Sequence, residues 1–162
     1  MSEVYLGNPN LKKANTSIEF TEENIREFMK CKEDPVYFAN NYIKIVSLDE
    51  GLTQFHPYHF QEKLIKNFHG NRFNICKMPR QTGKSTTVVS YLLHYAVFND
   101  SVNIGILANK AATARELLSR LQTAYENLPR WMQQGIISWN KGSLELETVS
   151  YTHLTLPTIL LG

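Results

Sequence analysis

The sequence has few of the features that would place it in several common protein classes. Its two cysteines, Cys31 and Cys76, form no Cys-x-x-Cys motif and no cluster with histidine, so neither a disulfide framework nor a zinc site is predicted. This cysteine usage is typical of a reducing, cytosolic setting. The chain begins with no basic segment followed by an apolar stretch, and no run approaches ~18 consecutive apolar residues. We therefore expect neither a signal peptide nor a transmembrane helix.

The chain also lacks a strong excess of charge of either sign. The formal net charge of +2 neither requires nor excludes contact with nucleic acid, because domains that bind it usually carry a clearly basic face. The composition, 43% apolar and 20% charged, is that of an ordinary globular protein. Eight tyrosines, eight phenylalanines and two tryptophans argue against disorder. A length of 162 residues corresponds to one domain or to a piece of a larger one.

Helix start signals occur at several points along the chain. Thr21 has the character of an N-cap because two glutamates follow it, and Asp34-Pro35 combines an N-cap with proline at the first helical position. His56-Pro57 opens a third helix with apolar residues on one face. Two longer stretches with apolar residues at helical spacing predict helices over 85–98 and about 110–127.

Runs of alternating or continuous apolar residues predict the strands. A short strand is expected at 43–46, another at 72–77 directly before a glycine-lysine loop, and a buried one at 102–108. Two further strands, at 135–139 and 143–147, flank a turn. The order strand, loop, helix, strand, helix implies parallel strands joined by crossover helices. The predicted fold class is therefore α/β, a layered fold with a parallel central sheet.

The glycine-lysine loop carries the strongest functional signal. Such a loop binds phosphate when its backbone N–H groups and the start of a helix surround the anion, a lysine reaches the β and γ phosphates, and a hydroxyl ligates Mg²⁺. Gly83, Lys84 and Ser85 provide these parts, although Met78 stands where the general pattern has its first glycine. The alternative is an ordinary strand-to-helix turn with a glycine bend. The full run is Met78-Pro79-Arg80-Gln81-Thr82-Gly83-Lys84-Ser85-Thr86.

Residues around the loop are further candidates. Arg80 could stabilise the γ-phosphate as an arginine finger does, or form a surface salt bridge. Gln61 could read the adenine edge through its carboxamide while an aromatic neighbour such as Phe60 stacks on the base, although a glutamine at the start of a helix is usually solvated. Asp49-Glu50 follows an apolar run in the manner of a Mg²⁺-binding acidic pair, but it precedes the loop and is assigned to a turn.

Together these motifs resemble the N-terminal ATPase region of the large terminase subunit of tailed bacteriophages, the motor that packages DNA into proheads. The resemblance covers residues from about 4 to 148, and the absence of glycine at Met78 is normal for that family. It rests on four stretches: Leu6–Asn15 with Asp34–Ala39, Phe60-Gln61, Pro79–Thr86, and Gly105–Lys110 with Gly135–Leu146.

The resemblance implies a P-loop NTPase of the RecA-like (ASCE) class, incomplete in this chain, with ATP and Mg²⁺ as cofactors. By that resemblance Lys84 would contact the β and γ phosphates, Ser85 would help hold Mg²⁺, and Arg80 would sense or stabilise the γ-phosphate. ATP hydrolysis would drive translocation of double-stranded DNA, with the portal protein and the small terminase subunit as partners. The full-length protein would work in the host cell cytoplasm, as a homo-oligomer and without a membrane. The implied nucleotide-binding residues are Phe60, Gln61, Arg80, Gln81, Thr82, Gly83, Lys84, Ser85 and Thr86.

The resemblance ends near Glu147, which sets the expected organisation. We expect an extended lead-in over 1–20, a partial terminase ATPase domain over 21–148, and a non-native tail over 149–162 that looks like a translated sequencing adapter. A genuine divergent C-terminal strand is the alternative for the tail. The family's acidic metal-holding pair after the loop and its nuclease domain are missing from this sequence, so the chain alone is expected to hydrolyse ATP poorly or not at all. A helicase-like DNA translocase fragment and a non-catalytic nucleotide-binding fragment remain alternatives.

Overall fold

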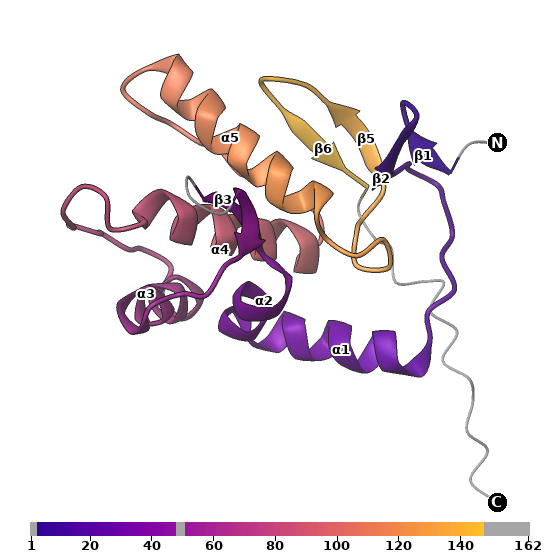
Figure 1. The fold of residues 1–162 in the computed structure, drawn as a ribbon, viewed down its shortest axis with the longest axis horizontal. Coiled ribbons are helices and arrows are strands. Elements are labelled where there is room, and N and C mark those ends of the chain that lie inside the picture. The colour runs from indigo at the N-terminus through magenta and orange to yellow at the C-terminus, as the bar shows by residue number, and fades with distance from the viewer. Residues whose placement is uncertain (1–2, 48–50, 148–162) are drawn as a thin grey trace, which may run out of the picture.

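The computed structural model describes residues 3–47 and 51–147, which form five helices and three separate two-stranded antiparallel sheets (Figure 1). None of these helices is long and apolar enough to cross a membrane within the described residues. Two sequence predictions, the turn at Asp49-Glu50 and the tail over 149–162, lie outside them. In chain order the elements are β1 (Val4–Tyr5), β2 (Asn8–Lys12), α1 (Glu22–Glu33), α2 (Pro35–Tyr42), β3 (Lys44–Ser47), β4 (Gly51–Gln54), α3 (His59–Gly70), α4 (Lys84–Phe98), α5 (Ala111–Glu126), β5 (Ile136–Trp139) and β6 (Leu144–Leu146).

Helix α4 lies at the centre, with α5 packed on one side and α2 and α3 on the other (Figure 1). Its inner face buries Val89, Leu93 and Val97, which recur every four residues and so share one side of the helix. Phe38 of α2 and Ile65 of α3 belong to the same buried cluster. The core is therefore centred on helix faces packed on α4, and the loop that leads into α4 ends at this central helix.

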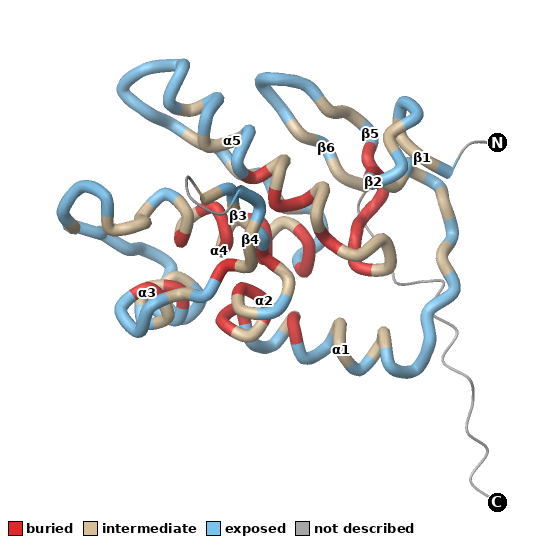
Figure 2. Tube along the Cα trace, viewed as in Figure 1, coloured by how far each residue is buried: buried red, intermediate tan, exposed pale blue. Residues whose placement is uncertain are grey.

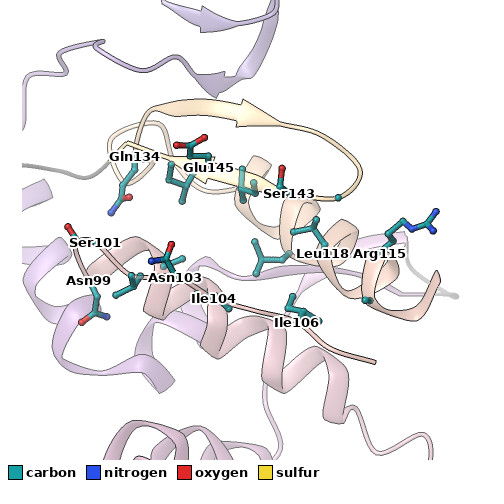
Figure 3. Close-up of a pocket in the computed structure, with 17 residues that line it drawn as sticks. Asn99, Ser101, Asn103, Ile104, Ile106, Arg115, Leu118, Gln134, Ser143 and Glu145 are labelled. Carbon is teal, nitrogen blue, oxygen red and sulfur yellow. The ribbon is translucent and has the colours of Figure 1, made fainter. Parts of the chain in front are cut away.

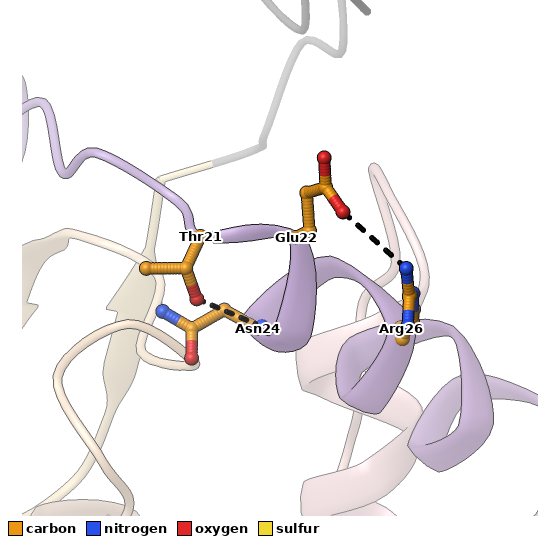
Figure 4. Close-up of polar contacts among 4 residues, drawn as sticks. All are labelled: Thr21, Glu22, Asn24 and Arg26. Atoms are coloured by element: carbon orange, nitrogen blue, oxygen red, sulfur yellow. Dashed lines mark hydrogen bonds and ion pairs between the residues drawn. The ribbon is translucent and has the colours of Figure 1, made fainter.

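The predicted helix starts at Thr21 and Asp34 are confirmed, each by a side chain that caps its helix. Thr21 Oγ1 accepts a hydrogen bond from the Asn24 backbone N–H at 3.2 Å (Figure 4). Glu22 and Arg26 form an ion pair one turn apart at 3.3 Å, which contributes little because both side chains are exposed. Asp34 Oδ1 accepts two backbone hydrogen bonds from the first turn of α2, at 2.9 and 3.0 Å. These caps satisfy N–H groups that a helix start otherwise leaves free.

The three other predicted helices are confirmed, with one shift. Those expected over 85–98 and about 110–127 correspond to α4 and α5. The helix expected to open at His56-Pro57 begins slightly later, at His59, after the N-cap residue Tyr58. Helical spacing of apolar residues thus predicts these helices well, because each helix buries one face against another helix.

Each sheet is a hairpin of two strands that are neighbours in the sequence. β3 and β4 pair in register from Lys44 opposite Gln54 to Ser47 opposite Gly51. β5 and β6 confirm the strands predicted on either side of a turn, and they pair with one irregularity. Local pairing of this kind needs only a short connection, so it forms without a crossover helix.

The N-terminal hairpin β1–β2 is packed onto the hairpin β5–β6. Leu11 of β2 is buried in the core, and Lys13 just beyond it forms a parallel bridge with Ile136 of β5. Gln133 connects the same regions, because its carboxamide accepts from the Lys12 backbone N–H at 3.0 Å and donates to the Asn10 carbonyl at 2.8 Å. Part of the stretch expected to be an extended lead-in therefore contributes to the core.

The predicted α/β layered fold with a parallel central sheet is wrong, because all paired strands in the described residues are antiparallel and locally connected. The segment 72–77, expected to be the strand before the loop, has no strand partner there, and Figure 2 shows it exposed. Phe73 and Ile75 are 83% and 100% exposed. The side chain of Asn74 donates to the Asn71 carbonyl at 2.9 Å, a local bond that competes with a sheet ladder. The alternation of apolar and polar residues in this segment is therefore not sufficient to form a strand.

The segment 102–108, expected to be a buried parallel strand, is also outside any sheet. Its residues alternate between half-buried and exposed up to Ile106, as in an extended segment with one face turned inward. Gly105 in its middle weakens a strand because it has no side chain to pack, and Leu107 is 94% exposed. The strand predicted from the period-2 pattern is therefore wrong, because the partner that a ladder requires is not among the described elements.

The two thiols differ sharply in their surroundings, which allows a direct test of the packing of α1. Cys31 is fully buried, and this burial raises the pKa of its thiol to about 12, whereas Cys76 is exposed. Because the thiolate is the reactive form, an aromatic disulfide reagent at pH 8 should label Cys76 rapidly and Cys31 only after unfolding in urea. The variant Cys76→Ser should lose the fast phase. Two equally fast thiols in the folded wild type would contradict the burial of Cys31.

Candidate functional site

The predicted phosphate loop leads directly into helix α4. Gly83 is the N-cap residue of α4 and has a left-handed φ of 72°, and Gln81 has a φ of 62°. Turns that contain left-handed residues bring successive backbone N–H groups together and form concave sites for anions. No side chain caps this helix, so its first N–H groups are left for a ligand or for water. The backbone of the loop is thus suited to an anion.

Lys84 closes the loop on itself. Its Nζ donates hydrogen bonds to the carbonyl oxygens of Met78 at 2.7 Å and Pro79 at 3.1 Å. Thr82 Oγ1 donates to the same Pro79 carbonyl at 3.1 Å. A phosphate would offer the ammonium an anionic acceptor in place of these neutral carbonyls. Lys84 is therefore held within the loop by contacts that an anionic ligand could replace.

Gln61 of α3 joins that helix to the loop. The side chain is 3% exposed, its Oε1 accepts from the Tyr58 backbone N–H at 2.9 Å, and its Nε2 donates to the Thr82 carbonyl at 3.3 Å. A Cβ added to Gly83 would lie 2.4 Å from Gln61 Nε2, so the loop passes the carboxamide too closely for a side chain. The structure thus shows Gln61 in contact with the loop. Adenine reading by Gln61 stays a prediction.

Phe60, predicted to stack on the base, lies beside Tyr58 at the start of α3. The two ring centroids are 5.8 Å apart with an interplanar angle of 10°, and both side chains are exposed. Tyr58 was not singled out from the sequence, although it lies in the aromatic stretch before Gln61. Neither ring lines the hollow in front of the loop. Stacking of Phe60 on a base therefore stays a prediction.

A hollow of about 390 Å³ opens in front of the loop, within the volume range of small-molecule sites. Three of its side chains, those of Arg80, Lys84 and Arg120, are cationic, and none of the described residues that line it is acidic. Arg80 is exposed and has no ion-pair partner within the described part of the chain. This charge fits a polyphosphate. The hollow is lined by Pro79, Arg80, Gln81, Thr82, Gly83, Lys84, Ser85 and Thr86 of the loop and by Arg120 of α5.

The predicted Mg²⁺ ligand Ser85 is exposed at the edge of this hollow. Across residues 3–47 and 51–147, no group of three or more His, Cys, Asp or Glu side chains could hold a metal ion. Mg²⁺ at nucleotide sites is usually bound by few protein oxygens, together with phosphates and water. The Ser85 hydroxyl could be one such protein ligand, and its contact with Mg²⁺ stays a prediction.

A larger hollow of about 570 Å³ lies elsewhere, between α5, β6 and the segment 99–106 (Figure 3). Leu118, Ile104 and Ile106 give it apolar walls, while Arg115 and Glu145 contribute opposite charges. It shares no lining residue with the loop. We take the smaller hollow as the candidate site because only there do several cations and free helix N–H groups meet.

No family model matches this sequence. The terminase resemblance therefore rests on the quoted motifs alone. The structure places Gln61 against the loop and collects Arg80 and Lys84 around one hollow, whereas Phe60 lies outside it. Arg120 was missed by sequence reasoning. An arginine four residues after Glu116 on a helix indicates a surface ion pair, which gave no signal of a site.

Proposed function

We propose that the chain binds the phosphates of ATP, together with Mg²⁺, in the hollow in front of Lys84. The observation that carries the proposal is the meeting of three cationic side chains, no lining carboxylate and the uncapped start of α4 in one place. Each of these features favours a polyphosphate, the cations by charge and the helix start by its N–H groups and dipole. ATP, when bound, would supply the cleavable phosphoanhydride bond.

Replacing Lys84 with alanine should weaken binding of Mg²⁺-ATP about 100-fold, because Lys84 is the least exposed of the three cationic residues and the charge-assisted bonds of its ammonium are worth on the order of 3 kcal/mol. Titration of a fluorescent ATP analogue measures the change. Lys77→Ala is the matched control, since Lys77 is exposed and lies outside the lining of the hollow. Equal affinities for the two variants, or no saturable binding by the wild type, would overturn the proposal and favour a non-catalytic structural fragment.

We further propose that bound ATP is hydrolysed slowly or not at all by this chain alone. Phosphoryl transfer relies on carboxylates that hold the metal and on a group that orients the attacking water. The described residues that line the hollow include no aspartate or glutamate. Steady turnover by purified wild type that is lost in Lys84→Ala would contradict this proposal while leaving ATP binding intact.

On its sequence motifs, we propose that the ATP site serves a DNA-packaging motor of the large terminase kind, with double-stranded DNA, the portal protein and the small subunit as partners. The support is Arg80-Gln81 ahead of Gly83-Lys84, with Gln61 held against the same loop. The test is to sequence the source DNA downstream of this reading frame. An apolar strand ending in Asp-Glu and an acidic nuclease cluster are expected there, and helicase motifs instead would favour a helicase-like translocase.

A further inference from the structure

Helix α5 contributes a cation to the phosphate hollow from outside the loop. Among the described residues that line it, Arg120 alone belongs to another element, and it reaches the opening because α5 packs along α4. Its guanidinium joins Arg80 and Lys84 around a space with no lining carboxylate. Of these three cations, Arg120 alone has a carboxylate partner among the described residues.

Arg120 is held in its present position by one exposed acid. Its Nη2 donates to Glu116 Oε1 at 2.6 Å, one turn earlier on α5, and the two side chains are 50% and 60% exposed. Exposed ion pairs within a helix contribute little because water screens them. A guanidinium binds phosphate through two parallel hydrogen bonds, which makes phosphate a strong competitor of a single carboxylate oxygen.

We propose that Arg120 is a phosphate-binding residue, whose guanidinium leaves Glu116 and contacts the phosphates of the nucleotide opposite Lys84. The inference rests on the proposed function, because it adds a ligand from α5 to the same site. Glu116 then competes with the nucleotide for Arg120. A bound nucleotide would link α5 to the start of α4, so that the packing of these two helices becomes sensitive to the ligand.

The first test compares the binding of Mg²⁺-ATP and of inorganic tripolyphosphate to Arg120→Ala and to the wild type. About tenfold weaker binding is expected for both ligands, because the contact is with phosphate and not with the base. Arg115→Ala is the matched control: it removes the same charge from the same helix, but Arg115 lines the larger hollow. Circular dichroism and urea unfolding verify that both variants keep the fold.

The second test uses Glu116→Gln, which frees Arg120 without removing it. Binding of Mg²⁺-ATP should tighten about threefold in the wild-type background and should not change in the Arg120→Ala background, because the effect acts through Arg120. If Lys84→Ala weakens binding while Arg120→Ala behaves like Arg115→Ala, the inference is overturned and the proposed function stands. If the wild type binds neither ligand, both are overturned.

Discussion

Replacing Gly83 with alanine is expected to reduce ATP binding below detection and to lower the free energy of unfolding by about 3 kcal/mol. Gly83 has a φ of 72°, a conformation that costs a residue with a Cβ on the order of 1 kcal/mol or more. The new Cβ would also lie 2.4 Å from Gln61 Nε2, which is closer than real Cβ contacts come. Either the loop or Gln61 must therefore move.

Neither movement is easy, because Gln61 is buried and both ends of its carboxamide are in use. Displacing it would leave the Tyr58 N–H at the start of α3 and the Thr82 carbonyl in the loop without a partner. The Gln61 carboxamide is itself buried, and a buried polar group left unpaired costs about 1–3 kcal/mol. A shift of the loop instead would move the backbone N–H groups and Lys84 away from the arrangement that suits phosphate. The substitution should thus affect stability and binding together.

Urea unfolding and titration with a fluorescent ATP analogue measure the two effects. Gly70→Ala is the matched control, because Gly70 ends α3 without a positive φ, and a Cβ there would meet nothing within 4 Å. This control should be neutral or slightly stabilising. The double variant Gly83→Ala/Gln61→Ala should lose less stability than the sum of the losses in the two single variants, since the clash is absent once the Gln61 side chain is removed. A Gly83→Ala variant as stable as Gly70→Ala would be incompatible with the close contact.

Features of this fold that depend on a few neighbouring residues could be predicted from the sequence. The caps at Thr21 and Asp34 are local hydrogen bonds, and α4 and α5 follow from apolar residues that recur along one face. The hairpin β5–β6 needs only two short strands and the turn between them. In each case the residues that form the feature lie close together in the sequence. The local sequence pattern is therefore sufficient to predict it.

The sheet topology was predicted wrongly because the alternation of apolar and polar residues in a segment does not identify the strand with which that segment pairs. The segments 72–77 and 102–108 have a strand-like pattern, yet a strand exists only where a second backbone supplies its hydrogen bonds. The side chain of Asn74 in the first segment bonds to the Asn71 carbonyl just before it, and Gly105 interrupts the second segment. Both segments are therefore extended or irregular connections, and the expectation of a parallel sheet that was built on them fails.

The candidate site was predictable where it is a continuous motif and not where it depends on packing. Residues 79–86 were identified as one run, and they line one hollow. The contact of Gln61 with Thr82 and the approach of Arg120 arise from the way α3 and α5 pack on α4, which the sequence does not display. The loop contacts α3 through Gln61 and leads into α4, although the strand that the motif usually follows is not formed.

Acidification from pH 7.5 to pH 5 is expected to lower the free energy of unfolding by about 2 kcal/mol through His94 alone. His94 of α4 is 2% exposed and packs against the rings of Phe38 and Phe98, with centroid distances of 5.5 and 4.8 Å. Its Nε2 lies 2.9 Å from the Cys31 carbonyl oxygen, which can only accept, so Nε2 carries the proton. Nδ1 has no hydrogen-bond partner among the described residues and is unprotonated in the neutral ring.

Burial lowers the pKa of His94 from 6.5 to about 4, because the charged ring would lose its hydration, while the nearby Cys31 carbonyl opposes this shift. In the unfolded chain the ring titrates near pH 6.5. Between pH 6.5 and pH 4 the unfolded state therefore binds a proton that the folded state does not, and stability falls as the pH falls through this window. Above about pH 7 both states are neutral, and His94 adds no pH dependence.

The measurement is urea unfolding at pH 7.5 and pH 5 for wild type, His94→Gln and His69→Gln. Glutamine at position 94 remains neutral and can still donate to the Cys31 carbonyl, so this variant should lose about 2 kcal/mol of the pH response whatever its stability at neutral pH. His69 is exposed, and its ring lies 6.0 Å from that of His94, so His69→Gln should keep nearly the full response. Equal pH responses of His94→Gln and wild type would show that the His94 ring takes up a proton as readily in the folded as in the unfolded state, contrary to its burial against Phe38 and Phe98.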